Sequence, residues 1–225
     1  MTPMDDVWRI TAFTIATALG ATALMLPPGV LLALLLARGR FRGRVLLETA
    51  VSLPLVMPPV ATGLVLLLLF AARGPVGSLL GSAGIEVVFT WRAVVLAMTV
   101  MGLPLFVRTA RAGIEQVDCR YEAVASTLGA SPARVFATIT LPLAFPAVLA
   151  GAVLGFARAL GEFGATIMIA GSIPGATRTL AVAIYSFTDT GRDSDALMLV
   201  GVSAAIAFAA LWLSNYLSSR AGIRA

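Results

Sequence analysis

We predict that this chain is an all-α integral membrane protein with about five transmembrane helices. Hydrophobic residues make up 59% of its 225 residues and charged residues only 12%, whereas soluble domains are about half apolar and about one quarter charged. The mean hydropathy is +0.97. The apolar residues form continuous runs of the roughly 20 residues that a spanning helix needs. A membrane barrel would instead show alternation, so a helical bundle is favoured.

Five such runs follow one another within one predicted domain. The four runs that are easily bounded cover about residues 10–37, 45–70, 88–107 and 196–217. The first is preceded by Asp5 and Asp6 rather than by the basic region of a signal peptide, so we interpret it as a retained span. The second contains the adjacent prolines Pro58 and Pro59.

The fourth run can be placed in two ways. A helix over residues 136–157 would contain Pro142 and Pro146, and proline inside a helix removes a backbone hydrogen bond. A helix over residues 146–170 keeps its proline in the first turn, where proline is tolerated. We favour the second placement, with residues 132–145 approaching the membrane as a helix along its cytoplasmic face.

This placement puts Arg158 and Glu162 near the middle of the membrane. Their spacing of four residues places them on one helix face. Charges at this depth are costly and usually face a helix bundle or a cavity. Two interpretations remain open, namely an ion pair that fastens the fourth span to its neighbours and a pair that lines a pathway near a gate.

The distribution of basic residues predicts the orientation. All 16 basic residues are arginines, and the net charge is +5. They flank the apolar runs, which explains the charge without a nucleic-acid partner. With the N-terminus outside, the inner segments hold ten arginines and the outer ones five, so the positive-inside rule favours a cytoplasmic C-terminus. Residues 108–134 are then cytoplasmic. A six-span alternative, which splits 136–185, would move the C-terminal arginines outside and is less favoured.

Several enzyme classes conflict with the composition. The chain has no histidine and a single cysteine, Cys119. A Ser-His-Asp triad is therefore impossible, and most zinc and haem sites lack their usual ligands. The aspartates lie in the flanks rather than in the spans, which disfavours an intramembrane protease. We expect no catalytic residue and no metal site, and we keep an intramembrane enzyme or a stand-alone channel as remote alternatives to a transport subunit.

The cytoplasmic segment 118–134 has the pattern of a helix, a turn and a second helix. Apolar residues recur at helical spacing at Tyr121, Val124, Ala125 and Leu128. Gly129 fits the position just after a helix end. Ser131 fits a helix cap, with Pro132 at the first helical position. Glu122 could pair with a cation of a partner or hold the segment internally, and the sequence leaves both open.

The stretch EAVASTLGAS, followed by FATITLPLAFPAVLAG, resembles the EAA motif of ABC importer permeases. The match includes Glu122, Ala123, Gly129 and the LPL–P stretch over residues 141–146. The resemblance implies that the segment is a coupling helix, which docks in a cleft of a cytoplasmic ATPase. The implied coupling residues are Tyr121, Glu122, Ala123, Ala125, Leu128, Gly129, Ala130, Ser131 and Pro132.

Two further stretches, SLPLVMPPVATGLVLLLLF and FARALGEFGATIMIAGSIPGATRTLAVAIYS, resemble the oxyanion importer permeases of this family. Molybdate is the favoured cargo, with tungstate or sulfate as alternatives. The resemblance covers about residues 26–217 and implies the type I ABC importer permease fold in a bacterial inner membrane. The gate would be supplied by the second and fourth spans, with Pro58, Pro59, Arg158 and Glu162 as candidates.

The resemblance also implies partners. Two copies of this chain would form the pathway within the lipid, two ABC ATPase subunits would bind the coupling segments, and a periplasmic oxyanion-binding protein would deliver the anion. ATP and magnesium would bind to the ATPase. No cofactor is expected on this chain, which has no GxxxxGK[ST] phosphate loop.

Overall fold

The structure, a computed structural model, describes residues 3–220 and the side chains of residues 6–216 within them. Helices and their connections make up this part of the chain, and it contains no strand. The predicted all-α fold class is therefore confirmed. Four helical segments are long and apolar enough to cross a membrane, and a bent helix pair is a fifth candidate.

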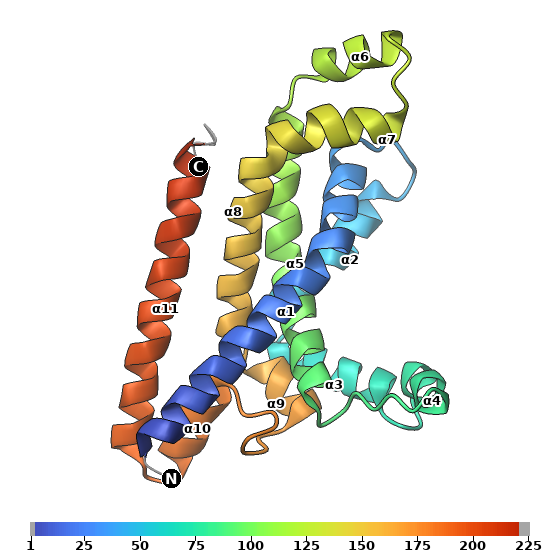
Figure 1. Ribbon diagram of the computed structural model, residues 1–225. Helices are drawn as coiled ribbons and strands as arrows, with labels where there is room; N and C mark the ends of the chain where they lie inside the picture. The colour runs from blue at the N-terminus through green and yellow to red at the C-terminus, as the bar shows by residue number, and fades with distance from the viewer. Residues whose placement is uncertain (1–2, 221–225) are drawn as a thin grey trace.

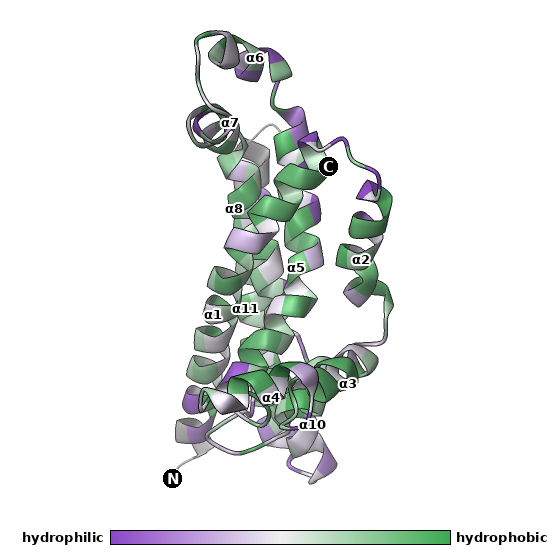
Figure 2. Cartoon of the chain, turned by 90° about the vertical axis from the view of Figure 1, so that its right-hand side faces the viewer, coloured by the Kyte–Doolittle hydropathy of each residue, from purple (hydrophilic) through white to green (hydrophobic). Residues whose placement is uncertain are grey.

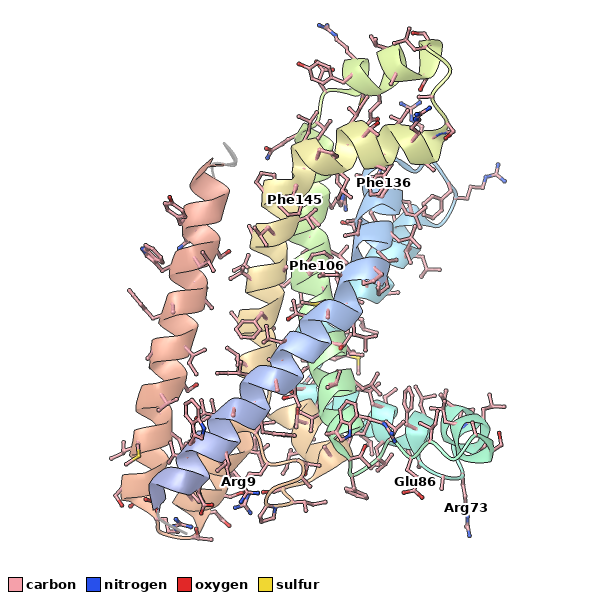
Figure 3. The ribbon with its side chains drawn as sticks, viewed as in Figure 1. Arg9, Arg73, Glu86, Phe106, Phe136 and Phe145 are labelled. Atoms are coloured by element: carbon pink, nitrogen blue, oxygen red, sulfur yellow. The ribbon has the colours of Figure 1, made fainter. Side chains whose placement is uncertain are left out.

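The long helices form a bundle around α5 (Trp91–Gln116). α5 packs on α1 (Pro3–Arg38) along one side and on α8 (Leu141–Leu160) along another, and α11 (Asp193–Arg220) packs on α8 (Figure 1). Phe106 of α5 is fully buried in this core (Figure 3). Close approach of α5 and α8 depends on glycine, because a Cβ on Gly102 would lie 2.9 Å from the Gly155 carbonyl oxygen.

Shorter helices gather at the two ends of the bundle. α6 (Cys119–Thr127) lies at one end, which we call the α6 end. The opposite end, which we call the α10 end, carries α9 (Gly164–Ala170) and α10 (Leu180–Asp189) (Figure 1). Most polar residues gather at these two ends, and apolar residues cover the length between them (Figure 2). This distribution is the one expected for helices that cross a bilayer.

The second predicted span is broken. Residues 45–70 form two helices, α2 (Arg44–Val56) and α3 (Pro59–Phe70), and the chain bends by 112° between their axes. The physical reason is the Pro58–Pro59 pair, which lacks two amide donors and disfavours helical geometry in the preceding residue. α3 then continues into α4 (Pro75–Ser82), a helix that lies in a predicted connection.

The fourth run, placed at residues 146–170, does not form one helix, because α8 (Leu141–Leu160) ends at Leu160 and α9 begins separately at Gly164. A continuous helical segment runs from Pro132 to Leu160, as α7 (Pro132–Val135), the π-helical turn η1 (Phe136–Thr140) and α8. Pro142 and Pro146 both lie inside this continuous segment. A wider turn and close packing on neighbouring helices can compensate for the backbone hydrogen bonds that proline removes from a membrane helix. Figure 1 shows α7 running sideways before the chain turns into α8.

The other three predicted spans fall inside long helices. Residues 10–37 lie within α1, residues 88–107 within α5 and residues 196–217 within α11. α5 continues for nine residues beyond its predicted end, so Arg108 and Arg111 are helical rather than part of a loop.

Candidate functional site

α6 is a short helix with well-defined ends. Asp118 caps its start, where the Oδ1 atom accepts a hydrogen bond of 2.9 Å from the amide of Arg120. Gly129 follows the helix with a φ of 85°, a left-handed conformation that glycine adopts without strain. The Ser131 hydroxyl then accepts a hydrogen bond of 3.4 Å from the amide of Arg134 and caps α7, which begins at Pro132. The chain therefore makes a sharp turn between two capped helices.

One side of α6 is apolar and largely exposed, and its residue Tyr121 also borders a hollow against α8. The exposed fractions are 59% for Tyr121, 59% for Val124 and 84% for Leu128. Ala123 is exposed as well, and Ala125 and Ala130 are half-buried. Large apolar side chains that share one exposed face commonly mark a protein contact. We call the face formed by Tyr121, Val124 and Leu128 the α6 face.

The inner side of α6 is tied to the bundle through Glu122. Arg38, the last residue of α1, donates two hydrogen bonds to Glu122 Oε1, of 3.2 Å from Nε and 3.1 Å from Nη2. The same Nη2 donates to the Val117 carbonyl at 2.7 Å, next to the end of α5. Thr140 of η1 donates its hydroxyl to Glu122 Oε1 at 2.8 Å. Glu122 therefore joins α6 directly to α1 and η1, and Arg38 links this contact to Val117.

This tether answers the question that the sequence left open for Glu122, which is held internally. Sequence reasoning missed both partners of the carboxylate. Arg38 is one of four arginines within residues 38–44, and Thr140 lies inside an apolar helical run. Neither residue carries a local signal that sets it apart.

Arg158 and Glu162 lie at the joint between α8 and α9, at the α10 end. Arg158 Nη1 is 2.8 Å from Glu162 Oε2. Glu162 is only 1% exposed, and its Oε1 accepts a hydrogen bond of 2.8 Å from the Ala165 amide at the start of α9. The pair therefore neutralises a buried carboxylate and closes the joint, which favours the fastening interpretation over an open lining position.

The structure brings the two groups of gate candidates together. A Cβ on Gly164, at the start of α9, would lie 2.7 Å from Pro59 Cβ. The Pro58–Pro59 break and the Arg158–Glu162 joint therefore meet at the α10 end, while the predicted coupling residues lie at the α6 end. Thr62 of α3 and Thr166 of α9 are buried there, and neither hydroxyl has a hydrogen-bond partner among the residues that the structure describes. Neither threonine stands out in the sequence.

Comparison with known proteins adds to this geometry. Residues 29–222 match the family described as "Binding-protein-dependent transport system inner membrane component". The chain is 44% identical over 216 residues to the molybdenum transport system permease protein ModB of Escherichia coli (strain K12), which covers 95% of this chain and 94% of that protein. It is 37% identical over 196 residues to the sulfate transport system permease protein CysT of Salmonella typhimurium, covering 87% and 71% of the two chains.

A similar fold occurs in a solved structure. A chain of the bacterial alginate ABC transporter, crystallised in complex with an alginate pentasaccharide-bound periplasmic protein, matches 94% of this chain and 78% of its own length. The TM-score is 0.65 at 19% sequence identity, so this likeness concerns the fold alone.

Proposed function

This chain belongs to the family of binding-protein-dependent transport system inner membrane components, and from that premise we propose that it is the permease subunit of an ATP-driven oxyanion importer. The observation that carries the proposal is the 44% identity to a molybdenum transport permease over 95% of the chain. The chain is a multi-pass inner membrane protein with the type I ABC importer permease fold. Molybdate is the proposed cargo.

The main alternative is a sulfate importer, which the lower identity of 37% to a sulfate permease makes the weaker choice. A tungstate importer is a further alternative, since tungstate is also a tetrahedral dianion. A stand-alone channel and an intramembrane enzyme have less support, because the relatives are transport permeases.

We assign the α6 end to the cytoplasm and the N-terminus to the outside. The sequence count of ten inner and five outer arginines supports this orientation. The position of Arg158 at the α10 end raises the number of outer arginines to six. The larger number of arginines is still on the side of α6. Transport would then run from the α10 end to the α6 end.

The α6 face is the proposed contact with a cytoplasmic ATPase, which would bind and hydrolyse ATP with magnesium. An apolar helix face that nothing in the described chain covers suits a groove in a partner. The Glu122 tether supports the transmission of movement, since a shift of α6 would act directly on the end of α1, on Val117 and on η1. A second copy of this chain, a second ATPase and a periplasmic oxyanion-binding protein complete the proposed assembly.

The proposed gate lies at the α10 end, where the Pro58–Pro59 break meets the Arg158–Glu162 joint. Helices broken within a membrane protein are common at transport sites, because the break allows one segment to move against another. Pro59 and Gly164 lie in close contact, so a movement of one break would displace the other.

The test is reconstitution of the complete transporter. The chain would be co-expressed with the ATPase and the binding protein encoded beside it, purified and placed in proteoliposomes. We expect the ATPase to co-purify and radiolabelled molybdate to accumulate only with ATP, with competition by tungstate above sulfate. A chain that never binds an ATPase under these conditions would refute the importer proposal. Stronger competition by sulfate would refute molybdate as the cargo.

A further inference from the structure

A polar ladder joins α2 to α5 near the α6 end. The two helices run in opposite directions (Figure 2). Side chains spaced by three or four residues along each helix meet across them. The rungs are Arg44 Nη2 to Glu115 Oε1 at 3.7 Å, Arg111 Nη1 to Glu48 Oε1 at 2.7 Å, and Arg108 Nη2 to Ser52 Oγ at 3.4 Å. Arg111 also pairs with Glu115 at 2.8 Å.

The ladder matters for the position of α2, because this helix has little apolar attachment. No residue of α2 is fully buried. Leu47 and Val51 contact the core only as partly buried side chains. The polar contacts of the ladder therefore add to a small apolar contact between α2 and the core.

The ladder is charge-balanced at two rungs and unbalanced at the third. Arg44 and Arg111 each face a carboxylate, while Arg108 faces the Ser52 hydroxyl. Within the described side chains, residues 6–216, no carboxylate lies within 4.0 Å of Arg108, and Ser52 is its hydrogen-bond partner. Arg38 and Arg158, at the ends of two other spanning helices, both have a carboxylate partner.

The unbalanced rung is also the deepest. Arg108 lies eight residues before the end of α5, and Ser52 lies eight residues after the start of α2. At 1.5 Å per residue this is about 12 Å inside the helix ends. Arg108 is exposed although its neighbours Phe106 and Val107 are buried in the core, so its side chain lies on the side of α5 that meets α2.

We propose that Arg108 and Ser52 form a weak contact site for a tetrahedral oxyanion, which the cargo occupies as it leaves for the cytoplasm. This inference rests on the proposed function and names a cargo contact within it. A guanidinium presents a fork of N–H donors that matches two oxygens of an oxyanion, and a hydroxyl donates to a third. A single exposed guanidinium binds weakly, which suits a site that must release its ligand. The two balanced rungs add no net charge between this site and the cytoplasm.

The test compares four variants in the reconstituted transporter, with radiolabelled molybdate uptake and ATP hydrolysis measured together. Arg108→Gln removes the charge, and Arg108→Lys keeps it. Ser52→Asp adds the missing carboxylate and so occupies Arg108 without weakening the ladder. The matched control is Arg42→Gln, an exposed arginine at the same end of the molecule.

We expect Arg108→Gln and Ser52→Asp each to lower uptake about tenfold, the scale of one charged hydrogen bond. ATP hydrolysis and ATPase co-purification should stay at the wild-type level, and Arg42→Gln should match the wild type. Arg108→Lys should recover part of the uptake that Arg108→Gln loses, because it keeps the charge but not the fork of donors. Thermal unfolding should show Ser52→Asp to be at least as stable as the wild type.

Three results would overturn the contact. The first is equal molybdate uptake by Arg108→Gln and Arg42→Gln, measured where the wild-type transporter is active. The second is normal uptake by Ser52→Asp, which would make Arg108 a fastener of α2. The third is unchanged uptake by Arg108→Gln together with a change in its thermal stability that appears in phospholipid but not in maltoside detergent. That result would mean that Arg108 binds a lipid phosphate. A wild-type transporter that moves no oxyanion would overturn the proposed function itself, and the contact with it.

Discussion

Glu122→Gln is the sharpest perturbation of the proposed coupling path. The substitution keeps the shape of the side chain and removes the charge that Arg38 and Thr140 meet. A hydrogen bond to a charged group contributes about 1.5–3 kcal/mol. The side chains of Arg38 and Glu122 are 23% and 20% exposed, so solvent screening lowers the expected loss to about 1–2 kcal/mol. This loss corresponds to a change of roughly 5- to 30-fold in the equilibrium constant between attached and detached α6.

The assay measures molybdate moved per ATP hydrolysed in proteoliposomes. Because the α6 face is unchanged, ATPase co-purification should persist, while the transport ratio falls. Arg38→Gln should give the same loss, and the double variant should lose little more, since both changes remove one contact. Glu86→Gln, an exposed carboxylate at the opposite end of the molecule (Figure 3), is the control. A wild-type ratio in Glu122→Gln, or strict additivity in the double variant, would refute the tether as the coupling path.

Three further predictions concern single positions. Gly129→Asp should insert normally but lose uptake, because an aspartate at a φ of 85° strains the turn that presents α6; quantitative blotting of membranes and an uptake assay check both parts, and normal uptake would contradict the turn assignment. Leu128→Arg should abolish ATPase co-purification while thermal stability stays within about 0.5 kcal/mol, since the side chain is 84% exposed; an intact complex on a sizing column would contradict the α6 face. Thr166→Val should leave thermal stability equal or higher, because it removes a buried hydroxyl without a partner; a lowered unfolding midpoint would mean that the hydroxyl has a partner in the assembled transporter.

The sequence predicted the fold class and the approximate position of most long helices, because apolar run length is a strong signal for membrane spans. It failed where proline was involved. The Pro58–Pro59 pair was visible but was treated as part of one span, although it breaks the helix by 112°. Pro142 and Pro146 were treated as barriers, although the helical segment runs through both. The effect of proline depends on whether neighbouring helices replace the lost backbone contacts, and a single sequence does not contain that information.

The candidate site shows the same division between local and distant information. The Gly129 turn and the Ser131 cap depend on adjacent residues, and the sequence predicted both. The partners of Glu122 lie 84 and 18 residues away along the chain. The Arg108–Ser52 contact joins residues that are 56 positions apart. Such contacts depend on how whole helices pack, so residue type alone could not identify them.

The chain's single cysteine lies on α6 and offers one site for a fluorescent or spin label. Cys119 is exposed at the first position of α6, beside the Asp118 cap and on the same short helix as the tether. A maleimide dye or a nitroxide would therefore attach at one defined place without any cysteine having to be removed from the chain. The spectrum of that label would follow the helix through each round of nucleotide binding and release in the otherwise native polypeptide.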